Sequence, residues 1–193
     1  MTPGINPGTR PETHAMDQQA ARTAPQAVDA ADDLADDLAR AAAVAAAVPD
    51  PEIPILTLGD LGVLRGVTRR DGHIVVRLTP TYTGCPATSV IALSVEMALV
   101  AAGFADARVE TVLSPAWTTD DLTPDGRRKL ADFGIAPPAG KASHRALFGE
   151  ETVACPRCGS TDTVRVSEFG STPCKAHWTC RACREPFDYF KCL

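Results

Sequence analysis

The chain of 193 residues has few aromatic side chains, no excess of positive charge and no long apolar stretch. Aromatics make up 5% of the residues, so a core must rest mainly on the aliphatic share of the 45% hydrophobic content. The formal charge of −5 argues against a nucleic-acid partner, because phosphate binders carry a basic excess. No run reaches the roughly 18 apolar residues of a membrane span, and no signal peptide is visible. We therefore expect no membrane association and a cytoplasmic location.

The sequence also lacks the motifs of common cofactor enzymes. No Gly-rich dinucleotide fingerprint is present, which argues against NAD or flavin binding. A carboxylate-bridged di-iron centre needs Glu-x-x-His pairs on long helices, and none of the four histidines has that setting. No motif places a histidine as the base of a nucleophilic hydrolase. We expect that the isolated chain is not an enzyme.

Composition divides the chain into a disordered leader, an α/β domain, a linker and a cysteine-rich module, over residues 1–28, 29–136, 137–152 and 153–193. Within the α/β domain the pattern predicts helix, strand, strand, helix, strand and helix. The first two strands are expected to form a hairpin around Asp71-Gly72, a dipeptide that favours tight turns. A third strand is expected over 108–113. The fold class is α/β, with a three-stranded sheet, packed helices and a small ribbon.

Two helices and one loop of this domain carry clear signals. Leu34, Leu38, Ala41, Ala45 and Val48 recur at helical spacing and predict an amphipathic helix from residue 29. Proline at every second or third position over 49–54 predicts a loop of fixed shape. A second helix follows Pro86, and its apolar side is expected to consist of Val90, Leu93, Met97 and Val100, widened by Ile91, Val95 and Ala98.

Six of the seven cysteines lie within the last 39 residues. Cys155 and Cys158 form one C-x2-C pair, Cys180 and Cys183 form another, and 21 residues separate them. Two such pairs let four thiolates converge on one ion, which indicates a zinc ribbon with strands over 163–167 and 176–179. A structural zinc is the favoured interpretation. Other ligand sets, including an iron–sulfur cluster, stay open because the tail holds three more candidate ligands, namely Cys174 and His177 before the second pair and Cys192 after it.

Cys85 is set apart from these thiols. It precedes Pro86 near the start of a predicted helix, where unpaired N–H groups and the helix dipole would lower its pKa. A functional thiol and a buried small apolar residue are both open interpretations. The hydroxyls of Thr79 and Thr81 precede Cys85 in the sequence, and three carboxylates lie on constrained loops before them, namely Asp50, Glu52 and Asp60. Helix capping and turn formation would also explain the carboxylates.

Together these motifs resemble a known family. Asp50-Pro51-Glu52-Ile53-Pro54, Asp60-Leu61-Gly62-Val63, Thr79-Pro80-Thr81-Tyr82 and Gly84-Cys85-Pro86 resemble domain of unknown function 59, also called the MIP18 type, which is associated with iron–sulfur cluster assembly. The tail, including Ser167-Glu168-Phe169-Gly170-Ser171-Thr172 and Glu185-Pro186-Phe187-Asp188-Tyr189-Phe190, is similar to the PaaD family of phenylacetyl-CoA 1,2-epoxidase systems.

The resemblance implies an accessory or maturation subunit of a ring-epoxidising oxygenase in aerobic phenylacetate degradation. Its partners would be the other subunits, especially an Fe–S-containing reductase, and it would assist assembly of an Fe–S or metal centre. Cys85 would be the functional thiol, with Asp50, Glu52, Asp60, Thr79 and Thr81 around it. The alternatives are a protein-interaction module of the same complex, a general Fe–S assembly factor and a self-contained thiol enzyme.

Overall fold

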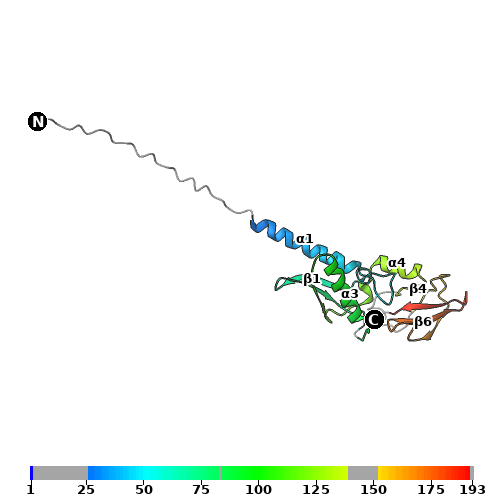
Figure 1. Cartoon of the computed structure of the whole chain (residues 1–193). Helices are drawn as coiled ribbons and strands as arrows, with labels where there is room; N and C mark the ends of the chain where they lie inside the picture. Colours follow the sequence, from blue (N-terminus) through cyan, green and yellow to red (C-terminus); the bar gives the residue numbers. More distant parts are fainter. Residues whose placement is uncertain (2–25, 83, 139–151, 192–193) are drawn as a thin grey trace.

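The computed structural model describes residues 1, 26–82, 84–138 and 152–191, and two small sheets organise it (Figure 1). Its elements, in chain order, are α1 (Gln26–Ala47), α2 (Leu58–Leu61), β1 (Leu64–Arg70), β2 (His73–Leu78), α3 (Thr88–Ala101), β3 (Arg108–Thr111), the 3-10 helix η1 (Thr119–Asp121), α4 (Pro124–Asp132), β4 (Ile135–Ala136), β5 (Thr163–Ser167), β6 (Lys175–Cys180) and β7 (Pro186–Phe190). The six elements predicted for the α/β domain occur in the predicted order, and the structure adds the short elements α2, η1 and β4.

The first sheet has the strand order β1-β2-β3. β1 and β2 form the expected antiparallel hairpin, whose turn residues Asp71 and Gly72 have φ angles of 50° and 83°. Two consecutive positive φ angles match the right-handed twist of the strands, which explains the Asp-Gly pair. β3 lies parallel to β2, and α3 makes the crossover between them. The buried positions of β2 supply the centre of the core.

α1 covers this sheet with the stripe that its spacing predicts. Ala41 and Ala45 are completely buried and Val48 nearly so, whereas Leu34 is exposed. Figure 1 gives the reason, because the N-terminal part of α1 extends away from the rest of the structure. The stripe therefore packs only over its C-terminal half.

α3 buries a different side from the one expected. Val95 and Leu99 are fully buried in the core, with Ile91 and Ala98 packed against it. The predicted side is instead the most exposed part of the helix, with Val90, Leu93, Met97 and Val100 all at least half exposed. The prediction was wrong because α3 is apolar on every side, so spacing alone does not identify the side that faces the sheet.

The second sheet joins the cysteine-rich module to the first domain. Its strand order is β4-β7-β6-β5, so the predicted two-stranded ribbon gains a third strand, β7, and a short strand from the preceding domain. β4 pairs with β7 in parallel, with Ile135 opposite Asp188 and Ala136 opposite Tyr189. The ribbon is thus hydrogen-bonded to the domain that comes before it in sequence.

Side chains of the ribbon also enter the core of the first domain. Phe190 and Cys174 belong to the same buried cluster as Leu58, Val76 and Leu99. The Phe190 ring meets Trp117 edge to face, with 6.1 Å between the ring centroids. Most of the predicted leader and of the linker lies outside the described residues. Within the described part of the chain, no helix combines the length and apolar character of a bilayer crossing.

Candidate functional site

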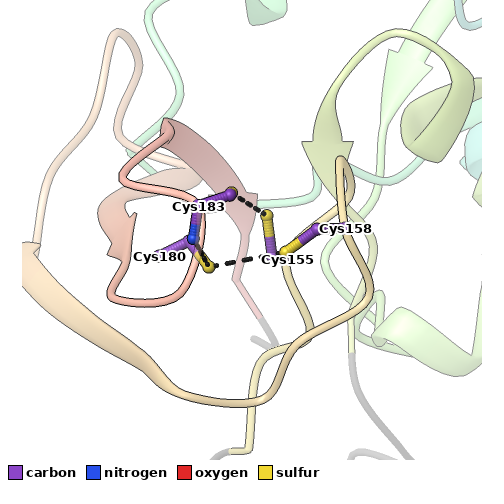
Figure 2. A group of neighbouring side chains, drawn as sticks. All are labelled: Cys155, Cys158, Cys180 and Cys183. Atoms are coloured by element: carbon purple, nitrogen blue, oxygen red, sulfur yellow. Dashed lines mark hydrogen bonds between the residues drawn. The ribbon is translucent and has the colours of Figure 1, made fainter.

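Four cysteines meet where two loops of the ribbon face each other (Figure 2). Their ligand atoms lie within 4.8 Å of one another, and the Sγ atoms of Cys155 and Cys183, like those of Cys158 and Cys180, are 3.7 Å apart. Sulfurs bound tetrahedrally to zinc at about 2.3 Å would be about 3.8 Å apart. Two of the sulfur pairs therefore already have the spacing of a zinc site, and all four thiols are close enough to share one ion.

The chain folds around this group in two tight loops. Gly159 ends the first with a φ of 75°, and its N–H donates to the Cys155 carbonyl at 2.9 Å. In the second, the Cys183 N–H points at the Cys180 sulfur at 3.5 Å. This N–H is the main cause that lowers the pKa of Cys180 to about 7. A backbone amide thus stabilises a thiolate before any ion is bound.

The additional candidate ligands of the tail do not join this group. Cys174 contacts the first domain instead, and His177 Nδ1 lies 3.6 Å from Asp188 Oδ1. Cys192 lies outside the described residues. Among the described residues, a single group of three or more potential ligands is close enough together to hold an ion. It consists of the four cysteines of the two pairs.

A second feature is a cavity of about 40 Å³ at the junction of the two modules. Five of the residues singled out in the sequence line it: Asp50, Glu52, Thr79, Thr81 and Cys85. Leu58, Val63 and Ile91 form part of its apolar wall, and the ribbon contributes Cys174 and Phe190. The structure therefore brings one thiol from each module to the same small space.

The loop that carries the two carboxylates has the fixed shape that its prolines predict. Asp50 Oδ1 accepts hydrogen bonds from the N–H groups of Glu52 and Ile53 at 2.9 and 2.7 Å. The Asp50 N–H donates to the Leu56 carbonyl at 2.9 Å, which closes the loop. The buried Asp50 carboxylate thereby holds the backbone that presents Glu52 to the cavity.

Cys85 lies in this cavity with a pKa opposite to the expected one. α3 begins at Thr88 with Ala87 as its N-cap, so Cys85 precedes the cap by two residues. Burial, together with the negative charges of Glu52 and Asp50, raises the pKa of the thiol, although the Ala87 N–H acts in the other direction. The expectation of a lowered pKa was wrong, because desolvation and the carboxylates outweigh the helix start.

Asp60 lies elsewhere. It does not line the cavity, and it forms a capping box with Thr57 at the start of α2. Its Oδ2 atom also accepts from Lys129 Nζ of α4 at 2.6 Å. Capping, the alternative explanation for this carboxylate, accounts for its place at the start of α2.

Cys174 is the pocket residue that sequence reasoning did not place there. It is 7% exposed, and its Sγ lies 3.8 Å from Glu52 Oε2, a residue 122 positions away. Burial is the main cause that raises its pKa to about 11. Its position outside the two C-x2-C pairs was the available signal, but nothing in the spacing indicates contact with Glu52.

In comparisons with known proteins, two family models match different parts of the chain. Residues 39–112 match the family described as iron–sulfur cluster assembly protein, and residues 139–191 match the PaaD zinc beta ribbon domain. A DUF59 crystal structure from Bacillus anthracis is 24% identical, covering 52% of this chain and 96% of that one, with a TM-score of 0.48. A solution structure from Mycobacterium tuberculosis, titled as associated with Fe–S complex assembly and repair, is 31% identical, covering 62% and 94%, with a TM-score of 0.30.

The chain thus combines a segment similar to iron–sulfur cluster assembly proteins with a segment similar to a zinc beta ribbon. A protein of Escherichia coli (strain K12), provisionally named as the D subunit of 1,2-phenylacetyl-CoA epoxidase, is 52% identical over 146 residues, 76% of this chain and 87% of that one. The chain belongs to this family of phenylacetyl-CoA epoxidase D subunits.

Proposed function

We propose that this chain is a maturation subunit of the phenylacetyl-CoA oxygenase system and assists assembly of an Fe–S or metal centre on a partner subunit. Catalysis of the epoxidation would take place on other subunits. The names of its relatives, an epoxidase subunit and an iron–sulfur cluster assembly family, support this role. The cytoplasm is the proposed compartment, since four-thiol metal sites need reducing conditions.

The observation that carries the proposal is the common cavity of Cys85, Asp50 and Glu52. A thiol beside two carboxylates offers sulfur and oxygen ligands to iron, which is the chemistry that a metal-centre assembly step requires. Thr79 is buried, and its N–H donates to the Val63 carbonyl at 2.9 Å, so it fixes the cavity wall next to Thr81. Cys85 is the proposed functional thiol.

The size of the cavity supports an accessory role. One water molecule needs roughly 10–15 Å³ of space open to its centre. The cavity offers about 40 Å³ of such space, which accommodates a small ion with a few waters. A CoA thioester is far larger than this space. The proposed cargo is a metal ion.

The ribbon has a different proposed task. Cys155, Cys158, Cys180 and Cys183 would hold one zinc ion, because closed four-thiolate sites are typically structural. The ion would replace a core that the ribbon is too small to build alone. Partner contacts, especially with an Fe–S-containing reductase, would then involve this rigid module and the pocket beside it.

The test is a Cys85→Ser substitution in a host that grows on phenylacetate. We expect slow growth and a partner reductase that is low in iron, while the variant itself keeps its fold and its ribbon metal. The control is Ser171→Ala, which removes an exposed hydroxyl bonded to Asp188 at 3.0 Å and leaves the cavity unchanged. Normal growth and full iron loading with Cys85→Ser would refute the role of Cys85.

The rival function is a module that only binds partner proteins. One observation favours it, namely the exposed apolar side of α3, which includes Leu93 and Met97 at 57% and 64% exposure. A module of this kind would tolerate Cys85→Ser and lose activity when Cys158→Ser unfolds the ribbon. The two substitutions in parallel therefore separate the rival from the maturation role.

A further inference from the structure

The first sheet has one face that the helices do not cover. Among the described residues, α1 and α3 are the helices that pack against this sheet, and both lie on the side of Ile74 and Val76, since Ala45 and Leu99 share their buried cluster. Val75 points to the opposite side, because neighbouring side chains of a strand alternate. It is 4% exposed but belongs to neither buried cluster. This opposite side is called the outer face below.

The register of the three strands places three arginines and one glutamate on the outer face, namely Arg70, Arg77, Arg108 and Glu110. Arg70 of β1 donates to Glu110 of β3 at 2.7 Å, so this ion pair passes over β2. Its passage over the central strand accounts for the burial of Val75. Three positive charges and one negative charge give the outer face a net charge of +2, in a chain whose formal charge is −5.

Two of these arginines have no carboxylate partner in the described part of the chain. Arg77 stands opposite Glu110 in register, but Glu110 is paired with Arg70. No hydrogen bond or ion pair joins the side chain of Arg77 or Arg108 to another described residue. The Nε atom of Arg77 is also shielded from water without a hydrogen-bond partner. A positive charge that is partly removed from water and left unpaired is unfavourable, so the outer face favours an anion.

Gly66 gives the Arg77 guanidinium its space. It lies opposite Arg77 on β1, and a Cβ atom at position 66 would lie only 3.2 Å from Arg77 Nη2. Its φ of 147° is a conformation that residues with a side chain rarely adopt. The guanidinium therefore lies beside bare backbone on the outer face.

We propose that the outer face binds an acidic, extended segment of a partner protein, and that Arg77 and Arg108 donate to its carboxylates. The planar guanidinium matches a carboxylate in two parallel hydrogen bonds. An extended segment directs every second side chain to the same side, so it can present carboxylates to both strands. A nucleic acid is the poorer partner, because Glu110 lies on this face and the chain as a whole is acidic.

This surface goes beyond the proposed function. None of its four charged residues lines the cavity that contains Cys85. The partner is identified only by its chemistry, as a protein segment rich in aspartate or glutamate.

The test uses the full chain, reduced and with its zinc bound, and a fluorescein-labelled peptide of about ten residues in which glutamate alternates with serine. Fluorescence anisotropy at about 50 mM salt measures binding, because salt screens exposed charges. We expect saturable binding that weakens as salt is added, and no binding of a peptide with glutamine in place of glutamate. Arg77→Gln and Arg108→Gln should each weaken binding about 10-fold or more. The control Arg128→Gln, which removes an exposed arginine of α4 paired with Asp125, should bind like the wild type.

Two further variants keep the test independent of misfolding. Glu110→Gln releases Arg70 from its ion pair and removes the negative charge, so it should tighten binding about two- to fivefold. A variant that had merely lost its fold would not gain affinity. Arg77→Lys keeps the charge but lacks the fork, and it should bind more tightly than Arg77→Gln and less tightly than the wild type.

The opposite results would overturn the proposal. Failure of the glutamate peptide to bind at low salt would remove the surface itself. Wild-type affinity in Arg77→Gln or Arg108→Gln, or an equal loss in Arg128→Gln, would mean that the attraction is not specific to the outer face. Tighter binding of a single-stranded oligonucleotide of equal charge would overturn the choice of partner. The growth test of Cys85→Ser is unaffected by any of these results, so the proposed function stands or fails separately.

Discussion

The two groups of thiols in this molecule are built in opposite ways. In the ribbon, sulfurs stand 3.7 Å apart in pairs, and a backbone N–H lowers the pKa of Cys180 to about 7. In the pocket, burial and carboxylates raise the pKa of Cys85, and burial is the main cause that raises that of Cys174 to about 11. The ribbon thus supplies a backbone N–H to one of its thiolates, whereas the pocket places Cys85 beside carboxylates that disfavour its thiolate. Metal binding releases protons from thiols, in the ribbon as in any such site.

The difference arises from the source of each ligand. The four ribbon cysteines come from two loops of one small sheet, so local folding is sufficient to position them. The pocket takes Glu52, Cys85 and Cys174 from three distant segments, and the last of these belongs to the ribbon. Experiments that remove one site and monitor the other therefore test the comparison directly.

The largest effect is expected from Cys158→Ser. Loss of one of four ligands should remove most of the roughly 10–16 kcal/mol that a structural zinc contributes in small domains. Because Phe190 of β7 is part of the first core, near-ultraviolet circular dichroism should change at Trp117 as well as at Trp178. Cys174→Ser is the matched control and should keep its zinc. A Cys158→Ser chain with full zinc content would contradict the proposed ligand set.

Phe190→Ala is expected to have the next largest effect. Phe190 is 1% exposed, and truncation of a buried Phe costs about 3–5 kcal/mol of unfolding free energy. Urea unfolding followed by tryptophan fluorescence measures this loss. Ribbon zinc should stay bound, because its four cysteine ligands lie within the ribbon itself. Unchanged stability would mean that the modules are not held together by this contact.

These contacts also show which features the sequence can predict. The hairpin at Asp71-Gly72 and the Cys155/Cys158 and Cys180/Cys183 pairs follow from short-range chemistry, and the structure has them as expected. The buried side of α3 does not follow, because the helix is apolar all round and the sheet decides its orientation. Sequence patterns of this kind report local preference and not the packing partner.

The pocket is a second case in which the sequence predicts local features but not the contacts between distant segments. Its loop at Asp50 was predictable from prolines, and Cys85 from its place before a helix. The direction of the Cys85 pKa was not, because it depends on burial and on carboxylates of a distant loop that the fold brings close. Contact between Cys174 and Glu52 spans 122 positions and has no local signature.

A smaller effect is expected for Asp60→Asn, which extends the comparison to the carboxylates. Burial opposes the charge of Asp60, but hydrogen bonds from Lys129 and Thr57 outweigh it and lower the pKa. A lowered pKa stabilises the fold at pH values above the unfolded pKa, near about 3.9, and this stabilisation is lost as the pH falls below it. Asp60→Asn should cost about 1–3 kcal/mol at pH 7 and less near pH 3, as measured by urea unfolding.

The control for this carboxylate is Asp125→Asn. Asp125 pairs with Arg128 at 2.6 Å on the surface, with side chains 59% and 65% exposed, so its loss should cost under about 0.5 kcal/mol. Equal losses of stability in the two variants would mean that the buried contacts of Asp60 are worth no more than an exposed ion pair.

The smallest effect concerns reactivity and leaves the fold intact. Alkylation requires the thiolate, and the raised pKa of Cys85 keeps most of this thiol protonated at pH 7. In the zinc-loaded chain its alkylation rate, followed by mass spectrometry of the Cys85 peptide, should rise about tenfold per pH unit with no plateau below about pH 9. Cys174, buried and with a pKa of about 11, should react more slowly at every pH. A plateau for Cys85 below about pH 8 would mean that the helix start outweighs burial, and the pocket thiol would then resemble those of the ribbon.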